Sequence, residues 1–167
     1  MKRLFFIGLV ILGFGVGFQA CKIYSFTGAN LPQSVKTFTV YYFPNRARLV
    51  NPTLSQLFTE SLREKLQRQT SLNEISENGD IEFEGQITGY DIKPIAIQKN
   101  DLAAQNRLTI TVNVKYINHK EPDQDFERSF SAFEDFSQSL SAVEDELCQE
   151  IVKKLNEDIF NATIANW

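Results

Sequence analysis

The sequence is poor in the side chains on which metal and thiol chemistry depend, with one histidine, His119, and two cysteines, Cys21 and Cys148. A structural zinc site draws on about four cysteine or histidine ligands, and a catalytic cysteine needs a histidine partner. His119 lies in a polar stretch, and the sequence has no glycine-rich phosphate loop. We therefore predict a non-enzymatic protein with no catalytic centre, no metal site and no cofactor.

Long basic runs are also missing. The chain has 17 Lys and Arg against 21 Asp and Glu, for a net charge of −4. An acidic chain without a basic stripe is a poor partner for nucleic acid, whose binding depends on neutralising phosphates. Aromatic residues, in contrast, are plentiful, with 14 Phe and 5 Tyr. This content excludes a disordered chain and predicts a folded domain with an apolar core.

Only one long apolar run is present, over residues 4–18. It is too short for a membrane-spanning helix, which needs about 20 apolar residues. Lys2 and Arg3 precede the run, and the small Ala20 and then Cys21 follow it, which is the layout of a secretory signal peptide. A cysteine directly after the cleavage position is typical of bacterial lipoproteins. Cys21 is therefore predicted to carry acyl chains such as palmitate and to form the new N-terminus.

This N-terminal pattern divides the chain into three parts. Residues 1–20 are the predicted lipoprotein signal peptide, residues 21–34 the lipidated cysteine and tether, and residues 35–167 a single α+β domain. Two alternatives stay open here: a membrane-spanning anchor, and plain secretion with Cys21 as an ordinary residue. If Cys21 is acylated, Cys148 has no disulfide partner, and its apolar neighbours predict a buried small hydrophobe.

Hydrophobic periodicity predicts six elements in the order β-α-β-β-β-α. The strand predictions rest on apolar–polar alternation and on β-branched and aromatic content. The helix predictions rest on apolar stripes at spacings of three and four residues. The predicted strands cover residues 35–43, 81–92, 107–116 and 126–133, and the predicted helices cover residues 51–70 and 141–164.

Local signals mark the ends and irregularities of these elements. Asn51 is predicted to cap the first helix, and Ser141 with Glu144 has the form of a capping box for the second. The alternation changes phase at Gly89, which predicts a β-bulge. Lys93-Pro94 is predicted to end regular pairing or to mark a sheet edge, and residues 95–106 are predicted to form a long loop or an irregular hairpin end.

The order of the elements predicts how they pack. A helix joins the first two strands, which allows these strands to pair in parallel with a right-handed crossover. Short connections join the other strands into an antiparallel meander. Each helix has one apolar stripe, so both can cover the same face. The predicted fold class is α+β, a two-layer sandwich with a four-stranded mixed or antiparallel sheet and two helices on one face.

Five basic residues are predicted to gather at one end of this sheet. If the first two strands are parallel, the loops that follow them lie at the same end, away from the tether. These loops and the start of the third strand carry Arg46, Arg48, Lys93, Lys99 and Arg107. Such a cluster suits an anionic ligand, including a phosphorylated lipid head group. The alternatives are scattered surface charge and pairing with nearby acidic residues.

Several segments, in their order after the lipoprotein signal, carry a family resemblance: Val35–Phe38, Tyr42–Ala47, Asn51–Ser55, Asn106–Ile110 and Ala165–Trp167. Together they resemble the LptE-type lipopolysaccharide-assembly lipoproteins of the outer membrane, in particular the Bacteroidota branch. The resemblance covers nearly the whole chain after Cys21. It implies a fold of two helices on a four-stranded sheet, which agrees with the pattern above.

The resemblance also implies a function. Such lipoproteins are lipid-anchored at the periplasmic face of the outer membrane, sit inside the large β-barrel LptD and help to insert lipopolysaccharide. The implied partners are an LptD-like barrel, lipopolysaccharide and, through the anchor, the membrane. The main alternative is a free-standing periplasmic lipoprotein that binds a small or lipidic ligand, which predicts an enclosed apolar pocket. An envelope hydrolase is a third option, and the lack of a catalytic constellation counts against it.

Overall fold

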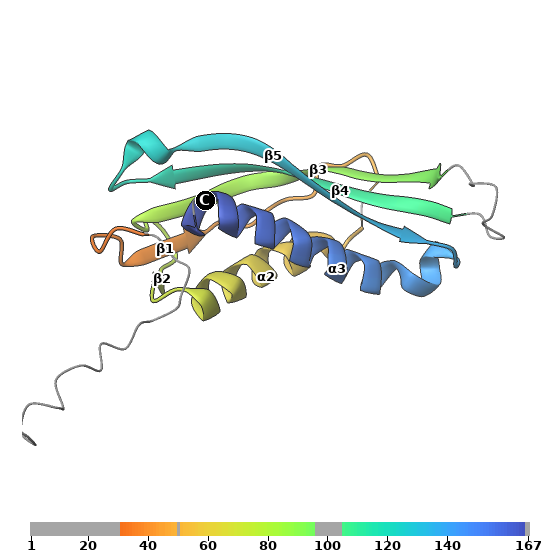
Figure 1. Cartoon of the computed structure of the whole chain (residues 1–167), viewed down its shortest axis with the longest axis horizontal. Helices are drawn as coiled ribbons and strands as arrows, with labels where there is room; N and C mark the ends of the chain where they lie inside the picture. Colours follow the sequence, from red (N-terminus) through yellow and green to blue (C-terminus); the bar gives the residue numbers. More distant parts are fainter. Residues whose placement is uncertain (1–30, 50, 96–104, 166–167) are drawn as a thin grey trace, which may run out of the picture.

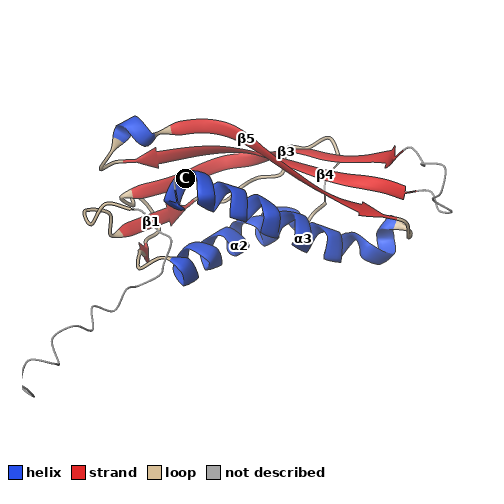
Figure 2. Ribbon diagram, viewed as in Figure 1, coloured by secondary structure: helices blue, strands red, loops and turns tan. Residues whose placement is uncertain are grey.

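A computed structural model describes residues 31–49, 51–95 and 105–165 of the chain. These residues form an elongated two-layer structure with both long helices on one face of a sheet (Figures 1 and 2). A short 3-10 turn, Pro122–Gln124, precedes the last strand, and one π-helical turn, Asn161–Ala165, extends the last helix. The main elements are β1 (Thr37–Val40), α2 (Leu54–Gln69), β2 (Asn73–Glu74), β3 (Ile81–Ile95), β4 (Gln105–Asn118), β5 (Phe126–Phe136) and α3 (Leu140–Phe160).

The strands form one mixed sheet in the order β2-β1-β3-β4-β5. β1 runs parallel to β3, with Phe38 opposite Ile81, and β3, β4 and β5 form an antiparallel meander. The predicted parallel start, meander and helix placement are therefore confirmed. The predicted number of four strands is wrong, because β2 adds a fifth at the edge of β1. β2 has only two residues, both exposed, so it has no alternation that a sequence pattern could reveal.

The hairpin of β3 and β4 is longer than predicted. Pairing does not end at Lys93-Pro94 but continues to Ile95, which lies opposite Gln105. Pro94 is tolerated because β1 pairs only with Ile81–Phe83, which leaves this half of β3 as a sheet edge among the described residues. The predicted bulge is confirmed, since the register shifts between Ile87 and Gly89.

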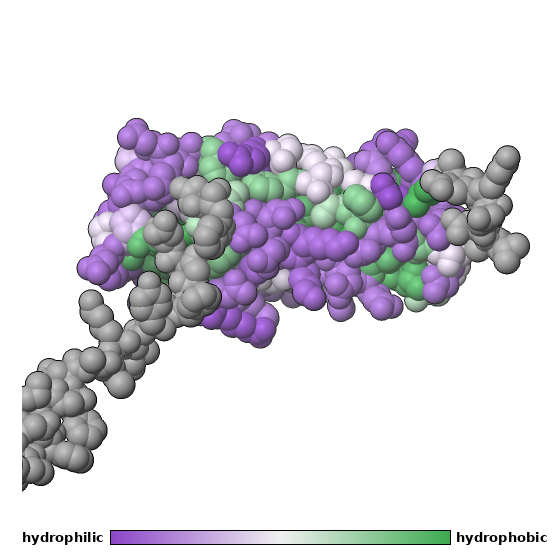
Figure 3. Space-filling model, viewed as in Figure 1, coloured by the Kyte–Doolittle hydropathy of each residue, from purple (hydrophilic) through white to green (hydrophobic). Residues whose placement is uncertain are grey.

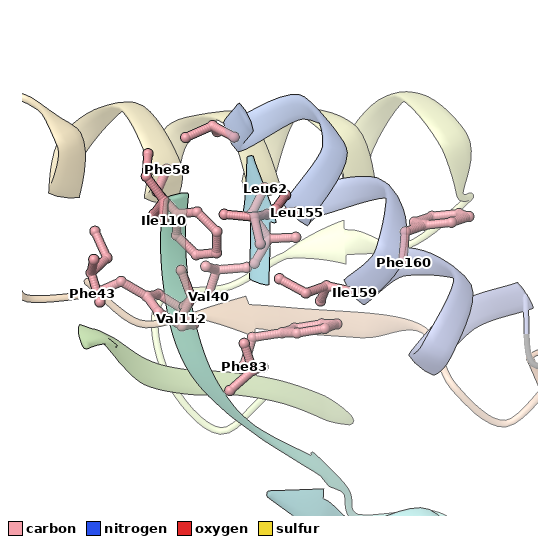
Figure 4. Close-up of a cluster of buried hydrophobic side chains, with 14 of the residues drawn as sticks. Val40, Phe43, Phe58, Leu62, Phe83, Ile110, Val112, Leu155, Ile159 and Phe160 are labelled. Atoms are coloured by element: carbon pink, nitrogen blue, oxygen red, sulfur yellow. The ribbon is translucent and has the colours of Figure 1, made fainter. Parts of the chain in front are cut away.

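The core lies between the sheet and the two helices. The Phe43 and Phe58 rings, from the segment after β1 and from α2, have centroids 4.9 Å apart. Replacing a large side chain of this layer by alanine typically costs about 2–5 kcal/mol of stability. Figure 4 labels ten of these buried side chains: Val40, Phe43, Phe58, Leu62, Phe83, Ile110, Val112, Leu155, Ile159 and Phe160.

Both helix starts differ from the sequence prediction. α2 begins at Leu54 with Thr53 in the cap position, so the prediction that Asn51 is the cap and Pro52 the first helical residue is wrong. Asn51 Oδ1 instead accepts hydrogen bonds from the backbone N–H of Thr53 and Leu54, at 3.0 and 3.1 Å, in the turn that leads into α2. The capping box of Ser141 and Glu144 is wrong. α3 begins one residue earlier than Ser141, and the Glu144 carboxylate is used by side chains from other elements.

Candidate functional site

β3 ends at Ile95, opposite Gln105 at the start of β4, at one end of the molecule, which we call the hairpin end (Figure 1). Lys93 and Arg107, from β3 and β4, face each other directly across the ladder there. Both lie on the sheet face that the helices leave free, because they alternate with the buried Leu108 and its partner Ile92. Lys93 is exposed and Arg107 is half-buried. The structure therefore brings two of the five predicted basic residues together.

Arg107 is already engaged by an acidic residue of β5. Its Nε and Nη2 atoms donate hydrogen bonds to Oδ1 and Oδ2 of Asp135, at 2.7 and 2.9 Å. This two-pronged contact with the guanidinium lowers the pKa of the Asp135 carboxyl. The guanidinium also lies 3.7 Å from the centroid of the Phe133 ring. Of the two facing cations, Lys93 is the one that forms no ion pair with a described acidic residue.

Arg46 and Arg48 lie further back along the sheet. The backbone N–H of Arg46 donates to Ile87 O at 2.8 Å, which is six residues before Lys93 on β3. At the usual rise of a strand this offset is about 20 Å. The physical reason is strand length: β1 has four residues and β3 has fifteen, so the chain leaves β1 long before it reaches the hairpin end. Both arginines are exposed.

Two predicted site residues lie outside the described residues, namely Cys21, the predicted lipidation site, and Lys99. Among the residues that the structure does describe, no group of three or more histidine, cysteine, aspartate or glutamate side chains is placed to hold a metal ion. No helix of this part of the chain is long and apolar enough to cross a membrane.

Sequence reasoning missed a buried polar network near the hairpin end. Glu144 Oε1 accepts hydrogen bonds from Tyr90 Oη at 2.6 Å and from Asn51 Nδ2 at 2.9 Å. Burial, helped by the neighbouring Glu144, raises the pKa of the Tyr90 phenol, and burial raises the pKa of the nearby Cys148 thiol to about 11. The predicted burial of Cys148 is confirmed, and the raised pKa of its thiol favours packing over reactivity.

The grooves of the described surface do not resemble an enclosed ligand pocket. One of about 510 Å³ runs between α2 and α3, and another of about 630 Å³ lies beside β1, β2 and α2. Both carry charged walls, with Glu60 and Glu64 in the first and Arg63 and Glu74 in the second. Figure 3 shows that the helical layer presents a largely hydrophilic surface. These grooves do not favour the alternative of a free-standing module for an apolar ligand.

In architecture the chain is a two-layer α+β protein whose sheet starts with a parallel crossover and ends in an antiparallel meander. Residues 35–163 match the model of the LptE family, described as lipopolysaccharide-assembly. The chain therefore belongs to the LptE family. This is a family of non-enzymatic, outer-membrane-associated lipoproteins of lipopolysaccharide assembly.

Several solved structures are similar to this chain at low sequence identity, and the first of the following supports the fold. A hypothetical protein from Chlamydia trachomatis is similar with a TM-score of 0.54 and 10% identity, over 79% of this chain and 99% of that chain. A minor lipoprotein from Acinetobacter baumannii has a TM-score of 0.46 and 14% identity, over 71% and 89% of the two chains. An uncharacterized lipoprotein B from Nitrosomonas europaea has a TM-score of 0.46 and 12% identity, over 77% and 81%. No curated protein matches the sequence.

Proposed function

We propose that the protein is a lipid-anchored, non-enzymatic lipoprotein that docks into a large outer-membrane β-barrel of the LptD type and assists the delivery of lipopolysaccharide. The observation that carries this proposal is the LptE family match over residues 35–163. In this proposal residues 1–20 are a signal peptide, Cys21 carries the lipid, and residues 21–34 form the tether at the periplasmic face.

The fold supports different roles for the two ends of the sheet, with the lipid anchor near one end and the ligand contact at the other. The described chain enters beside the start of β3, because the backbone N–H groups of Lys36 and Thr37 donate to Asp80 Oδ2 at 2.8 and 3.0 Å. β3 has fifteen residues, so about 50 Å separates this entry from the hairpin end. A lipid anchor at the near end therefore leaves the hairpin end free to reach away from the anchored leaflet.

The basic residues give the hairpin end a chemistry that suits a phosphorylated lipid. In the proposal Lys93 and Arg107 contact the anionic head group first, together with Lys99. Arg46 and Arg48, about 20 Å behind, contact another part of the lipid or the wall of the barrel. Arg107 can reach a phosphate only by sharing or leaving Asp135, so Lys93 is expected to contribute more to the affinity.

Co-purification tests the docking. The full chain carries a C-terminal tag in its native host, outer membranes are solubilised in mild detergent, and the proteins that elute with the tag are identified. We expect a large β-barrel at stoichiometric yield. A Cys21→Ser variant is expected to leave the outer membrane, while a Cys148→Ser variant stays. Elution of the wild-type lipoprotein without any barrel would refute the docking proposal.

A further inference from the structure

The helix-free face of β3, β4 and β5 carries a band of uncharged polar side chains. Two rows across the strands are set by the register: Gln86 opposite Asn113, which lies opposite Ser129, and Thr111 opposite Ser131. These positions alternate with buried residues of β4, so their side chains stand on the face away from the helices. We call the following set the neutral band: Gln86, Thr109, Thr111, Asn113, Ser129 and Ser131.

Ion pairs close the band at both ends along the strands. At one end Lys115 Nζ lies 3.3 Å from Glu84 Oε2, and at the other Arg107 is paired with Asp135. The exposed Asp91 lies on the β3 border of the band, opposite Thr109. The charged residues of this face therefore lie in ion pairs or at the border of the band, and the residues at its centre are uncharged.

The band keeps its hydrogen-bonding capacity available. Thr111 Oγ1 and Ser131 Oγ lie 3.2 Å apart. The side chains of Gln86, Asn113 and Ser129 form no hydrogen bond with the described residues, and each is exposed or half-buried. Hydroxyl and carboxamide groups both donate and accept, so the face offers mixed donors and acceptors on a regular strand lattice.

Two further residues shape the band. A Cβ atom at Gly89 would lie 3.0 Å from Thr111 Cβ, so the glycine keeps the surface beside Thr111 open. Phe133 lies opposite Thr109 and is 45% exposed, with the Arg107 guanidinium against its ring. The result is a polar surface with one aromatic side chain at its border.

We propose that the neutral band binds a neutral, hydroxyl-rich glycan chain. A phosphate-bearing ligand is disfavoured within the band, because none of its six residues is a cation; Lys93 and Arg107 lie beyond its end. A protein partner is disfavoured, because protein interfaces centre on buried apolar and aromatic clusters, and the band borders a single phenylalanine. Sugar hydroxyls match the donors and acceptors, and the exposed ring can pack against the C–H face of a sugar. This inference rests on the proposed function for the identity of the glycan, which would then be the saccharide part of the lipopolysaccharide.

Calorimetric titration of the full-length protein tests this inference. The probe is the polysaccharide of the host's own lipopolysaccharide after removal of acyl chains and phosphates, so that charge and lipid contribute nothing. We expect saturable binding that weakens about tenfold or more in a Thr111→Val, Asn113→Ala double variant, since two hydrogen-bonding groups are lost. A Ser131→Glu variant places a charge in the band and is expected to weaken binding similarly.

Matched controls separate this site from general effects. Gln56→Ala and Gln149→Ala remove exposed amides from the helical layer and are expected to leave the affinity unchanged. A lack of saturable binding to the wild type, or an equal loss in the control variants, would overturn the inference. Co-purification of the barrel with each variant distinguishes the two proposals. Barrel association without glycan binding refutes only the neutral-band site, and glycan binding without a barrel refutes only the docking proposal.

Discussion

The Tyr90 hydroxyl donates a hydrogen bond of 2.6 Å to the Glu144 carboxylate, and so joins the outer half of β3 to the first turns of α3. The same carboxylate oxygen accepts from Asn51 Nδ2 at 2.9 Å, while Asn51 Oδ1 accepts from the backbone N–H of Leu54, the first residue of α2. One carboxylate thus holds three elements in position near the hairpin end. Because Tyr90 is only 5% exposed, water is a poor substitute for this partner.

Truncation of Glu144 should therefore destabilise the fold. Glu144→Ala leaves the buried Tyr90 hydroxyl and the Asn51 amide without their partner, and we expect a loss of about 1–3 kcal/mol in the free energy of unfolding. Urea denaturation measures it. Glu146→Ala, at an exposed position of the same helix, is the control and should change stability by less than about 0.5 kcal/mol. Equal effects of the two variants would contradict the role given to this network.

Asp80 should make stability depend on acid pH. Hydrogen bonds from the backbone N–H groups of Lys36 and Thr37, together with the Lys120 ammonium 3.0 Å away, lower the pKa of this carboxyl to about 2. The folded state therefore favours the ionised form. The stabilisation is fully present above the unfolded pKa near 3.8 and is lost as the pH falls towards 2.

An Asp80→Asn variant isolates this contribution. We expect it to be less stable than the wild type by about 1–2 kcal/mol at neutral pH, with the difference shrinking between pH 4 and pH 2. Denaturant unfolding at a series of pH values measures the difference. Asp123→Asn, at an exposed position of the β4–β5 connection, should show no such trend. A difference for Asp80→Asn that stays constant down to pH 2 would rule out the titration of Asp80 as its source.

Gly85 should be the least replaceable residue of β3. Its φ is +156°, and a Cβ atom would lie 2.0 Å from the Asn113 carbonyl oxygen and 2.7 Å from the Phe43 ring. Gly85→Ala therefore forces apart two strands and a core aromatic, and we expect a loss of about 3 kcal/mol or more. Gly89→Ala is the matched comparison, since its closest contact is the Thr111 side chain at 3.0 Å. It should cost clearly less in thermal or urea unfolding.

The parts of the fold that the sequence predicts are those with a repeating local signal. Strand β4 alternates from Leu108 to Tyr116 and is recognisable without any partner, and the phase change at Gly89 marks a real bulge. β2 has no such signal, because two exposed residues cannot alternate. The Glu144 capping box was misread because the true partners, Asn51 and Tyr90, come from distant parts of the chain.

The candidate site shows the same limit. The parallel pairing of β1 and β3 was predicted correctly, but it does not bring the segment after β1 to the hairpin end, because Arg46 pairs with Ile87 in the middle of β3. The unequal lengths of β1 and β3 place Arg46 well behind Lys93. No residue pattern at the end of either strand indicates this difference in length. The pairing of Arg107 with Asp135 depends on the β4–β5 register. Local patterns therefore identified basic residues and their general direction, while tertiary geometry decided which of them lie together.

That pairing leads to a prediction about lipid binding. If Arg107 contacts lipid phosphate, it must leave Asp135, so the acid competes with the ligand for the guanidinium. Asp135→Asn removes the competing charge and should tighten binding of purified host lipopolysaccharide about two- to fivefold at low salt. Lys93→Ala should weaken binding by a similar factor. Both effects should shrink at high salt, because the charges are at the surface.

Asp123→Asn controls for net charge in this experiment, because it removes the same charge in the connection at the opposite end of the sheet from Lys93. If Asp123→Asn tightens binding as much as Asp135→Asn, the gain comes from the overall charge and not from a released guanidinium. If Asp135→Asn has no effect while Lys93→Ala weakens binding, Arg107 has only a structural role in the pairing of β4 with β5. A gain confined to Asp135→Asn is explained only by a guanidinium that the ligand and the acid share, which makes Arg107 a direct contact.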